Sequence, residues 1–360
     1  MIQLLEFGRD CRRGGEAYVA RFHSYLLSRF EHVTPESLPR LPDDLNNAWK
    51  RAQYCLRSVR QSRPRLLITD ISSATRNYFA ARLHLKHGGS LALIVQSVPP
   101  SCFSRSAARR LLTRHFEKFL FRFANIVICN SEFTASLATE RVRPDAAVAV
   151  ARPGTEMIPP ETAPARTETP ARHFRLLYVG ECSRVKGLIY AVKAMSLLRD
   201  RNILLDVAGG RHQEPYYADQ VKKLISREGL GDRIIFHGFC DRETLSGLYR
   251  HASAFVMPSL AEGYGMSLAE AFGYGLPSVA SSVGGIPELL EDGANGLAVP
   301  PADEAAIARA VIRLYEDESL CSRLGDAARK RALMLPTWDD FTQALDEQLK
   351  PAVISILEKR

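Results

Sequence analysis

The chain has 360 residues, 24% of them charged, and a formal net charge of +8. This length exceeds what one hydrophobic core organises comfortably, so two domains are expected. Residues 1–150 carry 23 Lys and Arg against 12 Asp and Glu, a net +11, whereas residues 151–360 carry 25 against 28, a net −3. A basic first half favours an anionic partner such as membrane headgroups or a phosphorylated acceptor, although a solvated basic surface has the same composition. No nucleic-acid partner is predicted.

Cysteine usage and the first residues bear on the compartment. Seven cysteines without a Cys-x-x-Cys pair favour a reducing environment and no disulfide framework. Met1 leads directly into the strand-like Ile2–Phe7, so no signal peptide is predicted. No uncharged apolar run approaches the ~20 residues that cross a bilayer. We therefore expect a cytoplasmic protein, either free or associated with the inner face of the membrane.

Strand-like and helix-like segments alternate through the first half. A glycine pair, Gly14-Gly15, follows the first strand and precedes a helix predicted over residues 17–29, a place where the backbone can approach a ligand. Ser131 suits a helix N-cap. Residues 158–172 are rich in Pro, Thr, Ala and Glu without apolar periodicity and are predicted to be a linker. The strands are predicted at residues 2–7, 65–69, 91–95, 124–133 and 146–151.

The most basic stretch, residues 105–122, has the spacing of an amphipathic helix. Leu111, Leu112, His115, Phe116, Phe119 and Phe123 recur at helical intervals, with Arg109, Arg110, Arg114, Lys118 and Arg122 between them. Such a helix either packs on the core with a solvated basic face or lies on an anionic membrane.

The second half alternates strands and helices at short intervals, which is typical of a parallel sheet covered on both faces. Ligands of such sheets bind beyond the carboxyl ends of the strands, so the loops there are the candidates. The strands are predicted at residues 175–179, 203–208, 233–236, 254–257, 278–280 and 296–299, with helices at 303–315, 318–335 and from 338 to the end.

One stretch, Pro258–Pro287, combines features of an anion site and a hydroxyl site. Gly265-Met266-Ser267 leads into a helix predicted over residues 268–274, and a helix that begins after glycine has free N–H groups and positive dipole density for an anion. Glu262 and Glu270 flank this start. Carboxylates would repel a phosphate, so they are expected to accept hydrogen bonds from neutral hydroxyls. Phosphate together with sugar hydroxyls describes a nucleotide sugar.

The sequence of this stretch, E-G-Y-G-M-S-L-A-E-A followed by G-L-P-S-V-A and G-G-I-P-E, resembles the retaining glycosyltransferases of family 4, in glycosyltransferase group 1. The resemblance implies the GT-B fold: two Rossmann-like α/β domains with parallel sheets that face a cleft, and a C-terminal helix that crosses back to the first domain. It places an acceptor-side domain at residues 1–157 with the closing helix at about 338–360, and the nucleotide-sugar-binding domain at 173–337. It also favours the packed interpretation of the basic helix.

The same resemblance implies roles for individual residues. Glu270 binds the ribose hydroxyls, Glu262 holds the donor sugar, and Lys186 neutralises the diphosphate. The family has an arginine where Glu181 stands, a charge that Arg184 could supply, and a histidine where Gln96 stands on the sugar side. The other implied positions are Gly14, Gly15, Gly180, Gly209, His237, Gly238, Gly265, Met266 and Ser267 around the donor and Ser131 on the acceptor side.

The implied reaction is a retaining, hexosyltransferase-type transfer from a UDP- or GDP-sugar to a hydroxyl of a glycan, lipid-linked or small-molecule acceptor. A phosphate oxygen is expected to take the proton of the attacking hydroxyl, and Glu262 as a covalent nucleophile is the less favoured mechanism. No Asp-x-Asp motif is present, so neither a metal nor another cofactor is expected.

Other functions remain open at this point. One is a nucleotide-sugar epimerase on the same fold, and another is a non-catalytic glycosyltransferase-like binding protein, which the departures at Gln96 and Glu181 allow. A nicotinamide-dependent oxidoreductase would need a Gly-x-Gly-x-x-Gly after the first strand, which is missing. Nothing in the sequence indicates the oligomeric state.

Overall fold

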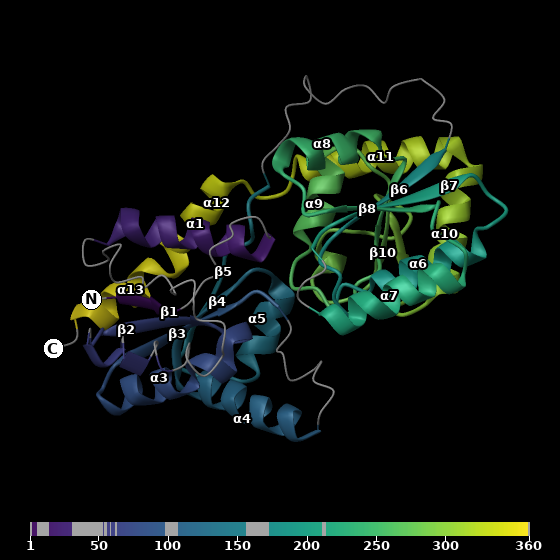
Figure 1. The fold of residues 1–360 in the computed structure, drawn as a ribbon. Helices are drawn as coiled ribbons and strands as arrows, with labels where there is room; N and C mark the ends of the chain where they lie inside the picture. Colours follow the sequence, from purple (N-terminus) through teal and green to yellow (C-terminus); the bar gives the residue numbers. More distant parts are fainter. Residues whose placement is uncertain are drawn as a thin grey trace. The chain divides into compact units, whose positions relative to one another are not determined.

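A computed structural model describes residues 2–5, 14–30, 63–97, 107–155, 173–210 and 214–358, with residues 53, 56–57 and 59–61 between the second and third of these ranges. The chain divides into two compact units, Met1–Gly154 with Trp338–Arg360 and Thr155–Thr337. The predicted linker at 158–172 lies outside the described residues. Each unit is a parallel sheet between two layers of helices (Figure 1).

In the first unit, alternate residues of the strands bury opposite faces of the sheet. Ile68, Ile94 and Ile128 pack under α1, α12 and α13, whereas Leu67 and Leu93 pack under α3, α4 and α5. Strands buried on both faces therefore have the continuous apolar sequences seen here. The described strands are all parallel, in the order β1 (Ile2–Leu5), β2 (Leu66–Asp70), β3 (Ser90–Val95), β4 (Ala124–Cys129), β5 (Ala147–Val150). The helices are α1 (Gly14–Arg29), η2 (Ile71–Ser73), α3 (Ala74–Lys86), α4 (Ala107–Phe123), α5 (Glu132–Thr139), α12 (Trp338–Gln348) and α13 (Lys350–Glu358).

Two helices of this unit differ from their predicted forms. The first, α1, begins at Gly14, so the Gly14-Gly15 pair forms its first turn and not the end of a loop. The closing helix predicted over 338–360 is two helices, α12 and α13. Pro351 has no N–H to continue the first helix and fits the first turn of a new one, which explains the break.

The closing helices belong to the first unit through a polar contact as well as apolar packing. Asp346 of α12 accepts a hydrogen bond from the Tyr25 hydroxyl at 3.2 Å and pairs with Arg29 at 2.9 Å. Phe341 lies edge-on to Tyr18, with the ring centroids 5.2 Å apart. Helix α12 is thus held against α1 by polar and aromatic contacts.

The second unit is again a sheet between two helical layers. One face packs against α6, α7 and α10, and the other against α8, α9 and α11. Its strands run parallel in the order β11 (Leu297–Val299), β10 (Ser278–Ser281), β9 (Ala254–Met257), β6 (Phe174–Val179), β7 (Ile203–Ala208), β8 (Ile234–Gly238). Its helices are α6 (Leu188–Leu197), α7 (Pro215–Arg227), α8 (Arg242–His251), α9 (Met266–Gly273), η4 (Ile286–Glu288), α10 (Glu304–Glu316) and α11 (Glu318–Ala332).

This order has a reversal in its middle. From β6 the chain proceeds to β7 and β8 on one side, and it then returns to β9, which pairs with the other edge of β6. The loops that leave the carboxyl ends of β6 and β9 therefore start side by side. In open α/β sheets this switch point is where ligands bind.

The two loops at the switch point touch backbone to backbone. Gly187 has φ of +68°, and a Cβ there would lie 1.9 Å from the carbonyl oxygen of Pro258. The Leu260 N–H donates to the Val185 carbonyl oxygen at 2.7 Å. Only glycine meets both the left-handed conformation and the lack of space at position 187.

Gly187→Ala should therefore destabilise the protein more than Gly229→Ala. Gly229 has a similar φ of +63°, but a Cβ at that position would have no atom within 4 Å. The control change should cost about 1–2 kcal/mol for the left-handed backbone alone, and Gly187→Ala about 1–3 kcal/mol more for the overlap. Denaturant unfolding of the two variants, followed by circular dichroism, measures the difference. Equal losses would show that the loops do not constrain each other.

Candidate functional site

The loop after β6, residues 180–187, is a compact turn that a buried tyrosine of β6 contacts from the core side. The Tyr178 hydroxyl donates to the Glu181 carbonyl oxygen at 2.9 Å, and the Lys186 N–H donates to the Ser183 carbonyl oxygen at 3.2 Å. Burial raises the pKa of Tyr178 well above its usual value, so the phenol keeps the proton that it donates. Lys186 is thereby placed at the end of this turn, next to the start of α6.

Lys186 and Glu262 meet across the switch point. The Lys186 Nζ lies 2.6 Å from Glu262 Oε2, and the Ser259 hydroxyl lies 3.4 Å from the same oxygen. The Glu262 side chain is 11% exposed and that of Lys186 is 32% exposed. The family resemblance assigns one residue to the diphosphate and the other to the donor sugar, and the structure brings both into one ion pair.

The backbone of Glu262 is held by the loop after β10. The Gly285 N–H donates to the Glu262 carbonyl oxygen at 3.1 Å. A Cβ at Gly284, whose φ is +59°, would lie 1.8 Å from that oxygen. Glycines at 284 and 285 thus let a third loop support the glutamate, which is the physical role of the G-G-I-P-E part of the motif.

Helix α9 begins at Met266, two residues before the predicted start, and its N-terminus has no side-chain cap. Its N-cap is Gly265, with φ of +105° and no side-chain capping bond, so Met266 and Ser267 lie in the first turn. The first N–H groups of a helix have no intrahelical acceptor and carry positive partial charge. This start directly follows the loop that carries Glu262.

Glu270 lies one turn further along α9 and is exposed. The hydroxyl of the buried Tyr249 donates to Glu270 Oε2 at 2.9 Å and lies 3.2 Å from the Ser267 carbonyl oxygen. The spacing of Glu262 and Glu270 in the sequence thus places one carboxylate in the loop before the helix and the other on the helix itself.

Three predicted glycines join the carboxyl ends of neighbouring strands. Gly180 donates to the Ala208 carbonyl oxygen at 2.9 Å, and Gly209 donates to that of Gly238 at 2.7 Å. Gly209 has φ of +147°, and a Cβ there would lie 1.9 Å from the Gly180 carbonyl oxygen. At these positions beside the switch point, backbone groups lie at the surface without side chains in front of them.

His237 has a partner that no sequence motif indicated. Its Nε2 lies 2.7 Å from Oδ1 of the buried Asp206, which also accepts two hydrogen bonds from Arg175, at 2.6 and 2.8 Å. Asp206 is 3% exposed, and a buried carboxylate needs such partners. The structure gives His237 a part in this hydrogen-bond network, and its contact with a nucleotide stays a prediction.

In the first unit, Gln96 and Ser131 lie at the carboxyl ends of β3 and β4. The Gln96 side-chain amide donates to Asp70 Oδ2 at 2.7 Å. Ser131 is fully buried and forms a capping box with Thr134 at the start of α5, which confirms the predicted cap. Its hydroxyl is occupied by this cap, and a contact with an acceptor stays a prediction for both residues.

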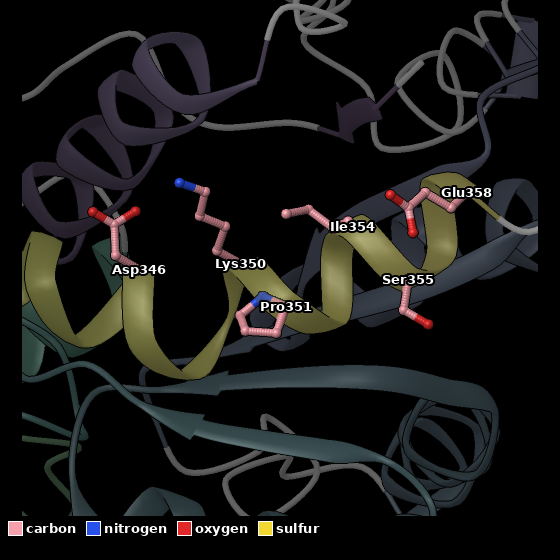
Figure 2. A pocket seen from close by; sticks show the side chains of 6 residues that line it. All are labelled: Asp346, Lys350, Pro351, Ile354, Ser355 and Glu358. Carbon is pink, nitrogen blue, oxygen red and sulfur yellow. The ribbon is translucent and has the colours of Figure 1, made fainter.

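Within the described residues, neither a cluster of metal-binding side chains nor a surface hollow offers a second candidate site. Among the residues that the structure describes, no three His, Cys, Asp or Glu side chains are gathered so that they could hold a metal ion. A shallow hollow lies against α12 and α13 of the first unit, where Lys350 and Ser355 point to opposite sides of the helix (Figure 2). The groups around it therefore do not converge on one ligand.

Sequence reasoning missed the residues that support this site. Tyr178 acts through the turn that follows it, Tyr249 through contacts with α9, and Gly284 through its lack of a side chain. The G-G-I-P-E motif was a signal for the glycine. Neither tyrosine stands in a motif, so no spacing could have indicated them.

The comparison with known sequences identifies the second unit. Residues 161–331, which include the whole switch-point site, match the family model for glycosyl transferases group 1. This part of the chain is similar to that family. An uncharacterized glycosyltransferase of Methanocaldococcus jannaschii is 32% identical over 169 residues, 47% of this chain and 42% of that relative. A D-inositol 3-phosphate glycosyltransferase of Streptomyces griseus is 31% identical over 215 residues, 56% of this chain and 46% of that relative. The matches thus span less than half the length of these relatives.

Solved structures extend the similarity to the whole chain. The sucrose-phosphate synthase of Thermosynechococcus elongatus has a TM-score of 0.79 at 21% identity, covering 98% of this chain and 99% of that one. HepE of Anabaena, in complex with UDP-glucose, has a TM-score of 0.74 at 18% identity, covering 97% and 99%. WaaG, a glycosyltransferase involved in lipopolysaccharide biosynthesis, has a TM-score of 0.74 at 16% identity, covering 97% and 100%. The chain has the GT-B fold, as predicted.

The Lys186–Glu262 pair predicts opposite effects of two substitutions on the binding of free UDP. Lys186→Ala should weaken binding about 10- to 100-fold, because a hydrogen bond to a charged group contributes ~1.5–3 kcal/mol. Glu262→Gln should strengthen it about two- to fivefold, because it frees the ammonium from a partly exposed pair worth ~0.5–1 kcal/mol. Titration calorimetry measures both affinities.

Lys193→Ala provides the matched control. Lys193 pairs with Glu304 at 3.1 Å in the same unit, with similar exposure, and should leave UDP affinity unchanged. Weaker UDP binding in Glu262→Gln would contradict the view that the carboxylate competes with the diphosphate for Lys186.

Proposed function

We propose that the protein is a retaining glycosyltransferase that transfers a sugar from a UDP- or GDP-sugar to an acceptor hydroxyl. The observation that carries the proposal is the Lys186–Glu262 pair at the switch point, directly before the open N-terminus of α9. One cation and a helix start suit a diphosphate, and the adjacent carboxylates suit sugar and ribose hydroxyls. UDP is the first nucleotide to test, because structures of HepE and TarM are described with it.

In the proposed reaction, the bond between the anomeric carbon and the diphosphate oxygen breaks as the acceptor oxygen bonds to that carbon. Lys186, Arg184 and the first N–H groups of α9 stabilise the charge that develops on the leaving diphosphate. Glu262 holds the donor sugar and Glu270 holds the ribose. The acceptor approaches from the leaving-group face, so a phosphate oxygen takes its proton and the configuration is retained. The chemistry as proposed uses no metal or other cofactor.

A donor screen tests this proposal. We expect UDP-glucose or another UDP- or GDP-sugar to raise the melting temperature, because a ligand at 100 times its Kd stabilises the native state by about 2.7 kcal/mol. Lys186→Ala should lose most of the shift. Absence of stabilisation by any UDP-, GDP- or ADP-sugar would overturn the proposal. Conversion of the donor sugar without an acceptor would favour an epimerase instead.

The exposed side chains of α4 indicate the kind of surface on which the acceptor is encountered. The helical periodicity of the sequence placed Leu111 and Leu112 on the same apolar face as Phe116. The prediction that this face packs on the core is wrong for the two leucines. Leu111 is 73% exposed and Leu112 is 53% exposed, whereas Thr113, Phe116 and Leu120 are buried. The buried face of the helix is the one with Thr113, Phe116 and Leu120. Phe116 fixes this orientation because it stacks on Tyr78 of α3, with the ring centroids 4.3 Å apart.

We propose that this face of α4 contacts an anionic membrane that presents a lipid-linked or otherwise anionic acceptor. Its exposed leucines stand among four exposed basic residues, Arg110, Arg114, Lys118 and Arg122. Basic residues near an anionic leaflet contribute about 1 kcal/mol each, and leucines can enter the headgroup boundary. Within the described residues, no helix has the length and apolarity to cross a bilayer.

Co-sedimentation with vesicles tests the membrane proposal. The protein should pellet with vesicles of anionic phosphatidylserine at low salt, and release should follow rising salt because exposed charges are screened. Charge reversal by Arg114→Glu with Lys118→Glu should weaken binding at least about tenfold. The control pair, Lys222→Glu with Arg250→Glu, changes exposed residues of the second unit by the same charge and should have little effect. Equal, negligible pelleting with anionic and neutral vesicles would leave a soluble acceptor.

A further inference from the structure

A buried phenol lies behind the exposed carboxylate of Glu270. Tyr249 belongs to α8 and is 2% exposed, and its hydroxyl donates to Glu270 Oε2 at 2.9 Å. The same hydroxyl lies 3.2 Å from the Ser267 carbonyl oxygen in the first turn of α9. One side chain of α8 thus contacts both the helix start and the carboxylate that the proposed function assigns to the ribose.

The direction of this hydrogen bond is set by the two groups. Burial, followed by the nearby Glu270 carboxylate, raises the pKa of Tyr249 well above its usual value, so the phenol remains protonated. A carboxylate can only accept, so the phenol donates and Glu270 Oε2 receives. The Ser267 carbonyl oxygen is a second, longer contact of the same hydroxyl, and the shorter bond to the charged carboxylate favours the Glu270 side-chain conformation that supplies it.

The phenol is itself held in place by packing. The ring of Tyr249 stacks on that of Tyr274, with centroids 4.8 Å apart and planes 11° apart, and it also lies near Phe255. The Tyr274 hydroxyl donates to the Ser246 hydroxyl oxygen at 2.8 Å and so keeps the second ring in position. Removal of the Tyr249 hydroxyl alone should leave this stack intact.

We propose that Tyr249 is a positioning residue for nucleotide recognition, which orients the Glu270 carboxylate to accept hydrogen bonds from the ribose hydroxyls. The inference rests on the proposed function and deepens it. A carboxylate has two oxygens and about four acceptor directions, and the bond from Tyr249 uses one of them. A bond from a rigidly packed phenol restricts the rotamers of the glutamate side chain.

The test compares two nucleotides that differ only in ribose hydroxyls. Titration calorimetry gives the Kd of UDP and of 2′,3′-dideoxy-UDP, or of the GDP pair if the donor screen selects it. Wild-type protein should bind the hydroxylated nucleotide at least about tenfold more tightly, since hydrogen bonds to charged groups are strong. Tyr249→Phe should lower this ratio at least threefold by weakening UDP while the dideoxy form is unchanged. Glu270→Ala should bring the ratio close to one.

Tyr274→Phe is the matched control, because it removes the hydroxyl from the other ring of the same stack. It should keep the wild-type ratio. Equal weakening of both nucleotides in Tyr249→Phe would indicate a merely structural role and overturn the inference. The inference would also be overturned if Tyr249→Phe kept the wild-type ratio of the two Kd values while Glu270→Ala brought that ratio close to one. Wild-type protein that binds neither nucleotide would overturn the proposed function itself. Wild-type discrimination that Glu270→Ala leaves intact would place the ribose elsewhere.

Discussion

The close approach of three backbone segments at the switch point is the constraint on which the site depends. The loop after β6 touches the loop after β9 at Gly187, and the loop after β10 touches it at Gly284. Side chains at either glycine would push these segments apart. Lys186 and Glu262 stand next to these contacts and can meet at 2.6 Å only because the loops are this close. The lack of side chains at Gly187 and Gly284 is therefore what allows the three loops to pack together.

The ion pair gives the site two properties at once. It neutralises the Lys186 ammonium, and it holds the Glu262 carboxylate in one place. In the proposed function, a diphosphate at Lys186 competes with that carboxylate, so part of the binding free energy of the donor is used to exchange one anionic partner of Lys186 for another. Because the pair is partly exposed, solvent screening keeps this cost small, and the exchange remains reversible.

Two buried tyrosines lie on the core side of the charged residues and hydrogen-bond to the segments that carry them. Tyr178 supports the turn that carries Lys186, and Tyr249 supports Glu270. In both cases an apolar ring fills the core while a hydroxyl reaches a polar group at its margin, a combination that tyrosine provides without the cost of burying a charge. The polar site is thus joined to rigid packing on both faces of the sheet, with Tyr178 on one face and Tyr249 on the other.

The sequence alone determined the α/β class, most of the strand positions and the placement of Glu262 and Glu270 around one helix start, because these depend on local periodicity and on a motif in one short stretch. The strand predicted over 124–133 was too long, since β4 ends at Cys129 and α5 begins at Glu132. The sequence could not determine which loops meet, since the order β9-β6-β7 follows from long-range strand pairing. Only the tertiary structure placed Lys186 against Glu262, Tyr249 behind Glu270 and Asp206 against His237, pairs separated by 76, 21 and 31 positions. It also decided which face of α4 is buried, because stacking on Tyr78 selects Phe116 over the leucines that share its helical periodicity.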